Sequence, residues 1–172
     1  MKRILIIGTS GVGKSTLAQR LSNHLQVPFF ASDQFYWEPG WKVSSPEKVR
    51  GQVMGVIARE AWILDGNFDD ERKWVWQRAD CIIWLDYSLM TICRRIVFRN
   101  FQWLFSRQST WSGNRMTLAR AISGIRHAVK SYSLKKQNYP HWLAELSDAV
   151  THRFYDSHET EEWLKSLKRA VE

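Results

Sequence analysis

The sequence predicts a three-layer α/β domain in which helices cover both faces of a parallel sheet. Five short apolar or β-branched runs alternate with segments of helical spacing along the 172 residues. This alternation is typical of parallel sheets with right-handed crossovers. Hydrophobic residues make up 44% and charged residues 24% of the chain, as in ordinary globular proteins. We therefore expect a single domain over residues 1–172.

The first strand and helix are the clearest elements. Arg3 to Ile7 is a β-branched run that ends at Gly8, which favours a fully buried strand. From Lys14 onward leucines repeat every four residues, so this segment is predicted to be a helix that closes before Pro28. A short second strand is expected at residues 29–31.

The middle of the chain is predicted to contain two more strands. WILD (residues 62–65) and CIIWLD (81–86) are apolar runs that each end in aspartate, and both are expected to be buried strands. A helix is expected to begin at Pro46, with Ser45 as its N-cap. A short helix around Trp74 lies between the two strands, and a long helix follows at 88–105.

The last third of the chain is basic and less regular. Residues 106–114 are polar and loop-like. A basic helix is predicted over about 116–136, and a separate short helix after Pro140. THRFY (151–155) is a weak fifth strand, and Ser157 is expected to cap a closing helix.

The stretch GTSGVGKST, residues 8–16, matches the phosphate-binding loop pattern of glycine, four residues, glycine, lysine and serine. Glycines let the backbone N–H groups curl around a phosphate, and the helix that starts near Lys14 adds its positive end. Lys14 is expected to reach the β- and γ-phosphates, and the Ser15 hydroxyl to ligate Mg²⁺. The residues expected to bind ATP are Gly8, Gly11, Val12, Gly13, Lys14, Ser15 and Thr16. Their glycine spacing differs from the dinucleotide-binding fingerprint.

Three aspartates are candidates for the chemistry that accompanies such a loop. Asp65 and Asp86 each end a predicted strand, where a carboxylate can hold the metal with its water shell. Asp65 is the first choice, with a simple Asp-Gly turn as the alternative, whereas Asp86 is better explained as the cap of the helix at Ser88. Asp33 follows the second strand, so it can orient or deprotonate an acceptor hydroxyl, unless it is only a turn residue.

The charge balance favours an anionic ligand. The net charge is +8 and the pI is near 9.7, which suits nucleotide phosphates, nucleic acid or an acidic partner. Cys81 and Cys93 lack metal-ligand spacing and are expected to be structural thiols of a cytoplasmic protein. No apolar run is long enough for a membrane span or a secretion signal.

Several strings resemble the adenylate-kinase-related P-loop kinases. These strings are the loop GTSGVGKST, the LDG after the third strand and RIVFR (Arg95 to Arg99). A more specific resemblance is that of SDQFYWEPGW, followed by WILDGNF, to the DNA topology modulation proteins, a group of predicted kinases. The resemblance covers about residues 1–105. It implies a P-loop NTPase sheet of order 2-3-1-4-5, an acceptor-binding segment at about 32–61 and a lid at about 100–126. It also implies that Arg95 and Arg99 face ATP, one near the adenine and one near the phosphates.

The chain departs from adenylate kinase where that enzyme binds the phosphate of AMP. Tyr36 and Asp69 stand at the positions of two arginines, so AMP is not the expected acceptor, because charge-assisted bonds to its phosphate are lost. Aromatic residues suggest an acceptor pocket with flat apolar walls, unless they only pack the segment against the sheet. These aromatic residues are Phe35, Tyr36, Trp37 and Trp41.

The sequence therefore predicts an ATP- and Mg²⁺-dependent kinase that transfers a γ-phosphoryl group to an unidentified small molecule. Its predicted catalytic residues are Lys14, Asp33, Asp65, Arg95 and Arg99, with Ser15 and Asp65 at the metal. A lid arginine, one of Arg107, Arg115 and Arg120, would cover the phosphoryl group, and the protein would be a monomer or homodimer. One alternative is an ATP-dependent nucleic-acid-associated protein that uses the basic helix; another is a bare ATPase that switches a partner.

Overall fold

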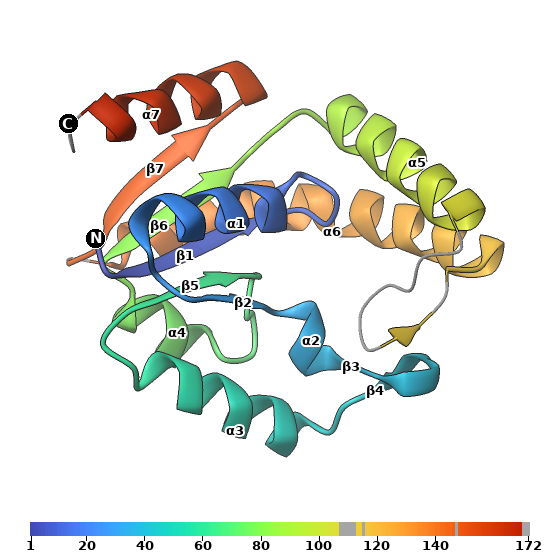
Figure 1. Ribbon diagram of the computed structural model, residues 1–172, viewed down its shortest axis with the longest axis horizontal. Coiled ribbons are helices and arrows are strands. Elements are labelled where there is room, and N and C mark those ends of the chain that lie inside the picture. Colours follow the sequence, from blue (N-terminus) through green and yellow to red (C-terminus); the bar gives the residue numbers. More distant parts are fainter. Residues whose placement is uncertain (107–112, 115, 147, 170–172) are drawn as a thin grey trace.

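A computed structural model describes residues 1–106, 113–114, 116–146 and 148–169 of the chain (Figure 1). Its main sheet has five parallel strands in the order β2-β5-β1-β6-β7. The strands are β1 (Arg3–Gly8), β2 (Phe29–Ala31), β5 (Trp62–Asp65), β6 (Cys81–Leu85) and β7 (Val150–Phe154). The predicted order 2-3-1-4-5 is the same order, because a small hairpin of β3 (Trp37–Glu38) and β4 (Lys42–Val43) shifts the numbering. The predicted fold class is thus confirmed.

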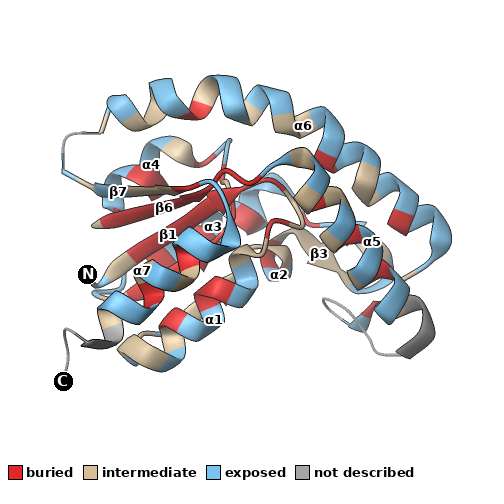
Figure 2. Cartoon of the chain, turned by 90° about the horizontal axis from the view of Figure 1, so that it is seen from above, coloured by how far each residue is buried: buried red, intermediate tan, exposed pale blue. Residues whose placement is uncertain are grey.

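Helices cover both faces of the sheet, as the alternating pattern predicts. The helices are α1 (Lys14–Leu25), α2 (Asp33–Tyr36), α3 (Pro46–Ile57), α4 (Arg72–Arg78), α5 (Leu89–Ser106), α6 (Leu118–Ala144) and α7 (Ser157–Arg169), and a 3-10 turn, η1, spans Pro39–Trp41. One apolar core packs α1 and α7 against the sheet, and the other packs α3, α4 and the end of α6 against its opposite face. Figure 2 shows the buried residues concentrated along the strands between these layers.

The register of the sheet explains where a site can form. Gly8 at the end of β1 lies beside Leu85 of β6, and Ala31 of β2 lies beside Asp65 of β5. Because all strands run in one direction, their carboxyl ends meet at one edge, where open α/β sheets bind ligands. The loops after β1, β2 and β5 are therefore neighbours, although they are far apart in the sequence.

Helix α6 differs from its prediction. The sequence suggests a break at Pro140, yet α6 runs without interruption to Ala144 with Pro140 inside it. Proline removes one backbone donor and crowds the preceding turn. Here the surrounding turn is held by packing, because Tyr139 is fully buried and its ring contacts Trp76 and Trp84 at centroid distances of 5.5 and 5.6 Å. Tertiary packing outweighs the local preference.

One of the two predicted helix caps is confirmed and the other is not. Ser45 accepts a hydrogen bond from the Lys48 N–H and caps α3 as predicted. The predicted cap of α7 is wrong by one residue, because the Asp156 carboxylate accepts from the N–H groups of His158 and Glu159 at 2.8 and 3.0 Å. Among the described residues, no helix has the length and hydropathy that a membrane span requires.

Candidate functional site

The loop between β1 and α1 adopts backbone angles that require glycine. Gly8, Gly11 and Gly13 have φ values of 144°, 83° and 110°, a region that other residues rarely adopt. Gly13 immediately precedes α1 and caps it without any side chain. The first N–H groups of α1 therefore have no partner within the helix, and such groups are ready donors for an anion.

Helix α5 packs directly on this loop. A side chain at Gly11 would overlap Ile96, which is only 1% exposed. The Arg95 guanidinium donates to the Val12 carbonyl and lies 4.9 Å from the centroid of the Tyr87 ring. Contacts from α5 thus fix the shape of the loop, which the sequence pattern alone does not reveal.

Replacing Gly11 with alanine is expected to lower the free energy of unfolding by about 2 to 4 kcal/mol, because it combines backbone strain with overpacking against Ile96. Denaturant unfolding measures the change. Gly55→Ala in α3 is a matched control, since an added methyl group there meets nothing within 4 Å, and it should stabilise the helix by about 0.5 to 1 kcal/mol. A Gly11→Ala variant as stable as the unmodified protein would contradict this packing.

Lys14 folds back across the loop. Its Nζ donates to the carbonyl oxygens of Gly8 and Thr9 at 3.0 and 3.3 Å. Burial lowers the pKa of the Lys14 ammonium, and the carboxylates of Asp65 and Asp33 oppose this shift. The ammonium thus lies over the hollow of the loop, at the position where a phosphate would meet it.

Asp65 links the loop to the second strand. Its carboxylate accepts hydrogen bonds from the Ser15 hydroxyl and from the Ser32 N–H, the latter at 2.9 Å, and the residue is only 3% exposed. Asp65 is therefore more than the start of an Asp-Gly turn. Its carboxylate and the Ser15 hydroxyl form an adjacent pair of oxygen donors, the ligand type that Mg²⁺ prefers.

Asp86 has a different role from either sequence interpretation. Its carboxylate accepts from Nη2 and Nε of Arg153 at 2.6 and 3.1 Å. Ser88 itself caps α5 by accepting from the Thr91 N–H, so the expectation that Asp86 caps this helix is wrong. Because Asp86 is 6% exposed and paired, it is occupied in joining β6 to β7.

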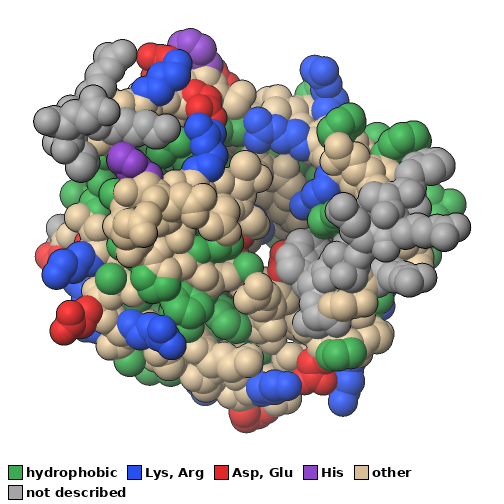
Figure 3. Space-filling view, in the orientation of Figure 1, with side chains coloured by type: hydrophobic (Ala, Val, Ile, Leu, Met, Phe, Trp, Pro, Cys, Tyr) green, Lys and Arg blue, Asp and Glu red, His purple; other side chains and the backbone are tan. Residues whose placement is uncertain are grey.

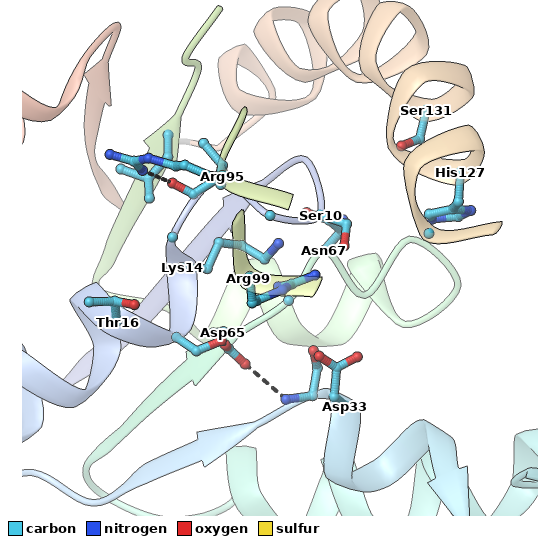
Figure 4. A pocket seen from close by; sticks show the side chains of 18 of the residues that line it. Ser10, Lys14, Thr16, Asp33, Asp65, Asn67, Arg95, Arg99, His127 and Ser131 are labelled. Atoms are coloured by element: carbon cyan, nitrogen blue, oxygen red, sulfur yellow. Dashed lines mark hydrogen bonds between the residues drawn. The ribbon is translucent and has the colours of Figure 1, made fainter. Parts of the chain in front are cut away.

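Asp33 and Arg99 complete the charged centre of the cavity (Figure 4). Burial raises the pKa of the Asp33 carboxyl, while Lys14 and Arg99 lower it. Burial also lowers the pKa of Arg99, and Asp33 opposes this. The Arg99 Nε is buried without a protein partner in the described part of the chain. Lys14, Asp33, Asp65 and Arg99 thus converge from four different elements.

The aromatic residues of the predicted acceptor segment divide between core and cavity. Phe35 is 8% exposed and belongs to the apolar core, so for this residue the alternative of packing against the sheet is correct and the place in the pocket wall is wrong. Tyr36, Trp37 and Trp41 do line the cavity. The Tyr36 hydroxyl donates to Glu71 at 3.2 Å, which ties this segment to the loop after β5.

Asn114, which precedes α6, and Arg120 at the start of α6 contact the same segment. Asn114, 5% exposed, accepts from the Trp41 N–H at 2.9 Å and donates to the Glu38 carbonyl at 3.0 Å. The Arg120 guanidinium lies 5.7 and 5.4 Å from the ring centroids of Trp37 and Trp41. Arg120 therefore packs on the acceptor side of the cavity. Arg107 and Arg115, the other two candidate lid arginines, lie outside the described residues.

These residues surround one cavity of about 1080 Å³, and the face shown in Figure 3 is hollowed near its middle. Its wall includes Gly11, Val12, Gly13, Lys14, Ser15, Thr16, Asp33, Asp65, Arg95 and Arg99. Gly8, the last residue of β1, lies next to the cavity, because its N–H donates to the side chain of Asn67, a wall residue, at 3.0 Å. Every residue predicted to bind ATP or the metal, or to take part in catalysis, thus lies in or next to the cavity.

The sequence interpretation missed one wall of the cavity. His127, Ser131 and Lys135 line it from α6, where the sequence predicts only a basic helix and, up to residue 126, part of the lid. Their spacing of four residues, which places them on one helix face, is the signal that was available. Within the described residues there is no group of three or more His, Cys, Asp or Glu side chains that could hold a metal, so the oxygen pair of Ser15 and Asp65 remains the candidate.

The five-stranded parallel sheet and the glycine loop match the P-loop fold that two solved kinases share. Shikimate kinase from Bacteroides thetaiotaomicron superimposes with a TM-score of 0.59 at 16% identity, over 99% of this chain and 98% of that one. A gluconokinase from Sinorhizobium meliloti 1021 gives a TM-score of 0.57 at 15% identity, over 98% and 93% of the two chains. At such identities the likeness shows the fold alone.

Sequence comparison adds one relative. The uncharacterized protein YqaC of Bacillus subtilis (strain 168) is 26% identical over 157 residues, which is 87% of this chain and 86% of that protein. No protein-family model matches the chain. None of these proteins carries a name that refers to DNA topology, so that resemblance stays a prediction.

Proposed function

We propose that the protein is a kinase that transfers the γ-phosphoryl group of ATP to a hydroxyl group of a small molecule. The observation that carries this proposal is the convergence of Lys14, Asp33, Asp65 and Arg99 in one cavity at the carboxyl edge of the sheet. The kinase names of the structural neighbours agree with it. In phosphoryl transfer, catalysis consists mainly of positioning and charge neutralisation, and this cavity offers both.

Each part of the site has a distinct task in the proposal. The N–H groups of the loop and the Lys14 ammonium bind the triphosphate. Ser15 and Asp65 would hold Mg²⁺, which would neutralise part of the phosphate charge. Arg95 fixes the loop through Val12, and Arg99 donates from the cavity side to phosphate oxygens.

The transfer step follows from the position of Asp33. The acceptor hydroxyl oxygen forms a bond to the γ-phosphorus, and the bond from that phosphorus to the β,γ-bridging oxygen breaks, which releases ADP. The Asp33 carboxylate accepts the hydroxyl proton. Asp33 suits this task because it lines the cavity beside Lys14. Burial raises the pKa of its carboxyl, which favours proton acceptance, and the charge of Lys14 partly opposes this rise.

The acceptor side of the cavity favours a molecule other than AMP. Tyr36 and Asp69 line it where adenylate kinase has arginines, and the Tyr36 hydroxyl is engaged with Glu71. Trp37 and Trp41 provide flat apolar surfaces, which suit the face of a ring. The nucleic-acid alternative gains no support here, because Arg120 and Lys135 of the basic helix line the cavity.

A phosphate-transfer screen tests the proposal. Nucleosides, nucleotides, sugars and aromatic acids are incubated with the protein, ATP and Mg²⁺, and release of ADP is measured against a reaction without acceptor. We expect one class of acceptor to stimulate ADP release and to yield a phosphorylated product. Equal ADP release with and without every acceptor would instead favour the bare ATPase, and no nucleotide binding at all would refute both.

A further inference from the structure

The cavity face of α6 carries positive charge that the proposed mechanism does not yet use. Six residues of this helix line the cavity: Arg120, Ser123, Gly124, His127, Ser131 and Lys135. Their spacings of three, four and one place them on one face of the helix, and none of them is acidic. Figure 4 shows His127 and Ser131 of this face across the cavity from the loop that carries Lys14. An anionic ligand on the loop would therefore meet α6 on its other side.

Among the described residues, Lys135 is the cation of this helix face that has no hydrogen-bonded or ion-paired partner. The Arg120 guanidinium packs on Trp37 and Trp41. His127 is expected to be neutral at pH 7, because burial lowers its pKa and Lys135 and Lys14 lower it further. Within the described parts of the chain, Lys135 makes neither a hydrogen bond nor an ion pair. A half-buried ammonium without a partner is costly, so its place in the cavity wall points to a ligand that would offset this cost.

The charges that face Lys135 indicate which group this ligand offers. The charge of Lys14, at the end of the loop after β1, and that of Asp69, in the loop after β5, both act on Lys135. Burial, with a further contribution from Lys14, lowers the pKa of Lys135 to about 8, and Asp69 only partly opposes this. The two ammonium groups thus repel each other across the cavity. An anion between them would be attracted by both and would remove this repulsion.

We propose that Lys135 binds the γ-phosphoryl group from the α6 side, so that this group is held between Lys14 and Lys135 during transfer. The inference rests on the proposed function, because it takes the phosphates to lie on the loop. Lys135 donates hydrogen bonds to the terminal oxygens of the γ-phosphoryl group and keeps its protons throughout. Those oxygens carry the charge of the transition state. Helix α6, which continues past the end of the predicted lid, would then perform the task that the sequence assigns to a lid arginine.

Comparison of two nucleotides tests this role without knowledge of the acceptor. ADP lacks the γ-phosphoryl group, whereas the β,γ-imido analogue of ATP has it and resists hydrolysis. In Lys135→Met the dissociation constant of the analogue should rise about tenfold to a hundredfold, the equivalent of one charge-assisted bond. That of ADP should stay within about twofold. Titration calorimetry with Mg²⁺ measures both constants.

Two control variants separate this role from a structural one. Lys136→Met removes the neighbouring charge, which lies on the Tyr132 ring at 5.6 Å, and should change neither constant. Lys135→Arg keeps the charge and should retain most of the preference for the analogue. If Lys135→Met proves unstable in thermal unfolding, the Arg variant and the pH series of the unmodified protein still decide the question.

The pH dependence gives a second readout. From about pH 7.5 to about pH 9 the free Lys135 loses its proton, so the unmodified protein should progressively lose its preference for the analogue over ADP. Lys14 and Asp69, the other charged groups that face Lys135, are also present in Lys135→Met, whose preference should change less over this range.

Four outcomes are decisive. Equal weakening of ADP and analogue binding in Lys135→Met would overturn the assignment to the γ-phosphoryl group. No change in either dissociation constant would also overturn it, and would indicate that Lys135 binds the acceptor instead. Failure of the unmodified protein to bind either nucleotide would refute the proposed function itself. Selective loss of the analogue supports both proposals.

Discussion

Lys14→Met is expected to weaken ATP binding by about a hundredfold or more, because it removes charge-assisted bonds to both the β- and the γ-phosphate, at about 1.5 to 3 kcal/mol each. Turnover should fall by about 10² to 10³ beyond this loss, since the same ammonium neutralises charge that develops in the transition state. Titration calorimetry and ADP release measure the two effects. Lys73→Met, which removes an exposed lysine of α4, should leave both unchanged.

The stability of Lys14→Met should move in the opposite direction from its activity. Because burial lowers the pKa of Lys14, the folded state disfavours the charged form relative to the unfolded chain, and the charged lysine costs stability at neutral pH. Its removal should therefore leave the melting temperature unchanged or raise it. A variant that unfolds more readily and binds ATP with unchanged affinity would show that Lys14 is structural.

Much of the fold follows from local patterns. Runs such as ILII and CIIWL are buried on both faces of a parallel sheet, and only continuous β-branched or apolar stretches satisfy that environment. The hairpin β3-β4 escapes prediction because each of its strands has only two residues, too few for any periodic signal. Pro140 misleads because packing of the neighbouring Tyr139 decides the course of α6.

The site divides in a similar way. The loop residues and Asp65 are predictable because their chemistry depends on neighbours in sequence and on the shared edge of parallel strands. Lys135 is not, because the direction in which a helix face points depends on how α6 packs against the sheet. The role of Asp86 is not predictable either, because its partner Arg153 is 67 residues away in the sequence and no local pattern indicates the pair.

Asp33→Asn is expected to lower turnover by about 10² to 10⁴ with the acceptor that the screen identifies, the range for removal of a positioned general base. The amide keeps the shape of the side chain but accepts no proton. Binding of the ATP analogue should not weaken, because this substitution removes a negative charge that acts on the phosphate-binding Lys14. Steady-state kinetics and titration calorimetry separate the two effects, and Glu60→Gln, an exposed carboxylate before β5, serves as the control.

The pH profile supplies the sharper test of Asp33. Burial raises the pKa of this carboxyl above its usual value, so the proton-accepting form is lost as the pH falls through that raised pKa. Turnover of the unmodified enzyme should then decline on the acid side at a higher pH than an ordinary aspartate would give, and the Asn variant should lack this decline. An acid limb that persists in Asp33→Asn would assign the proton transfer to another group, and Asp33 would be left with the task of orienting the hydroxyl.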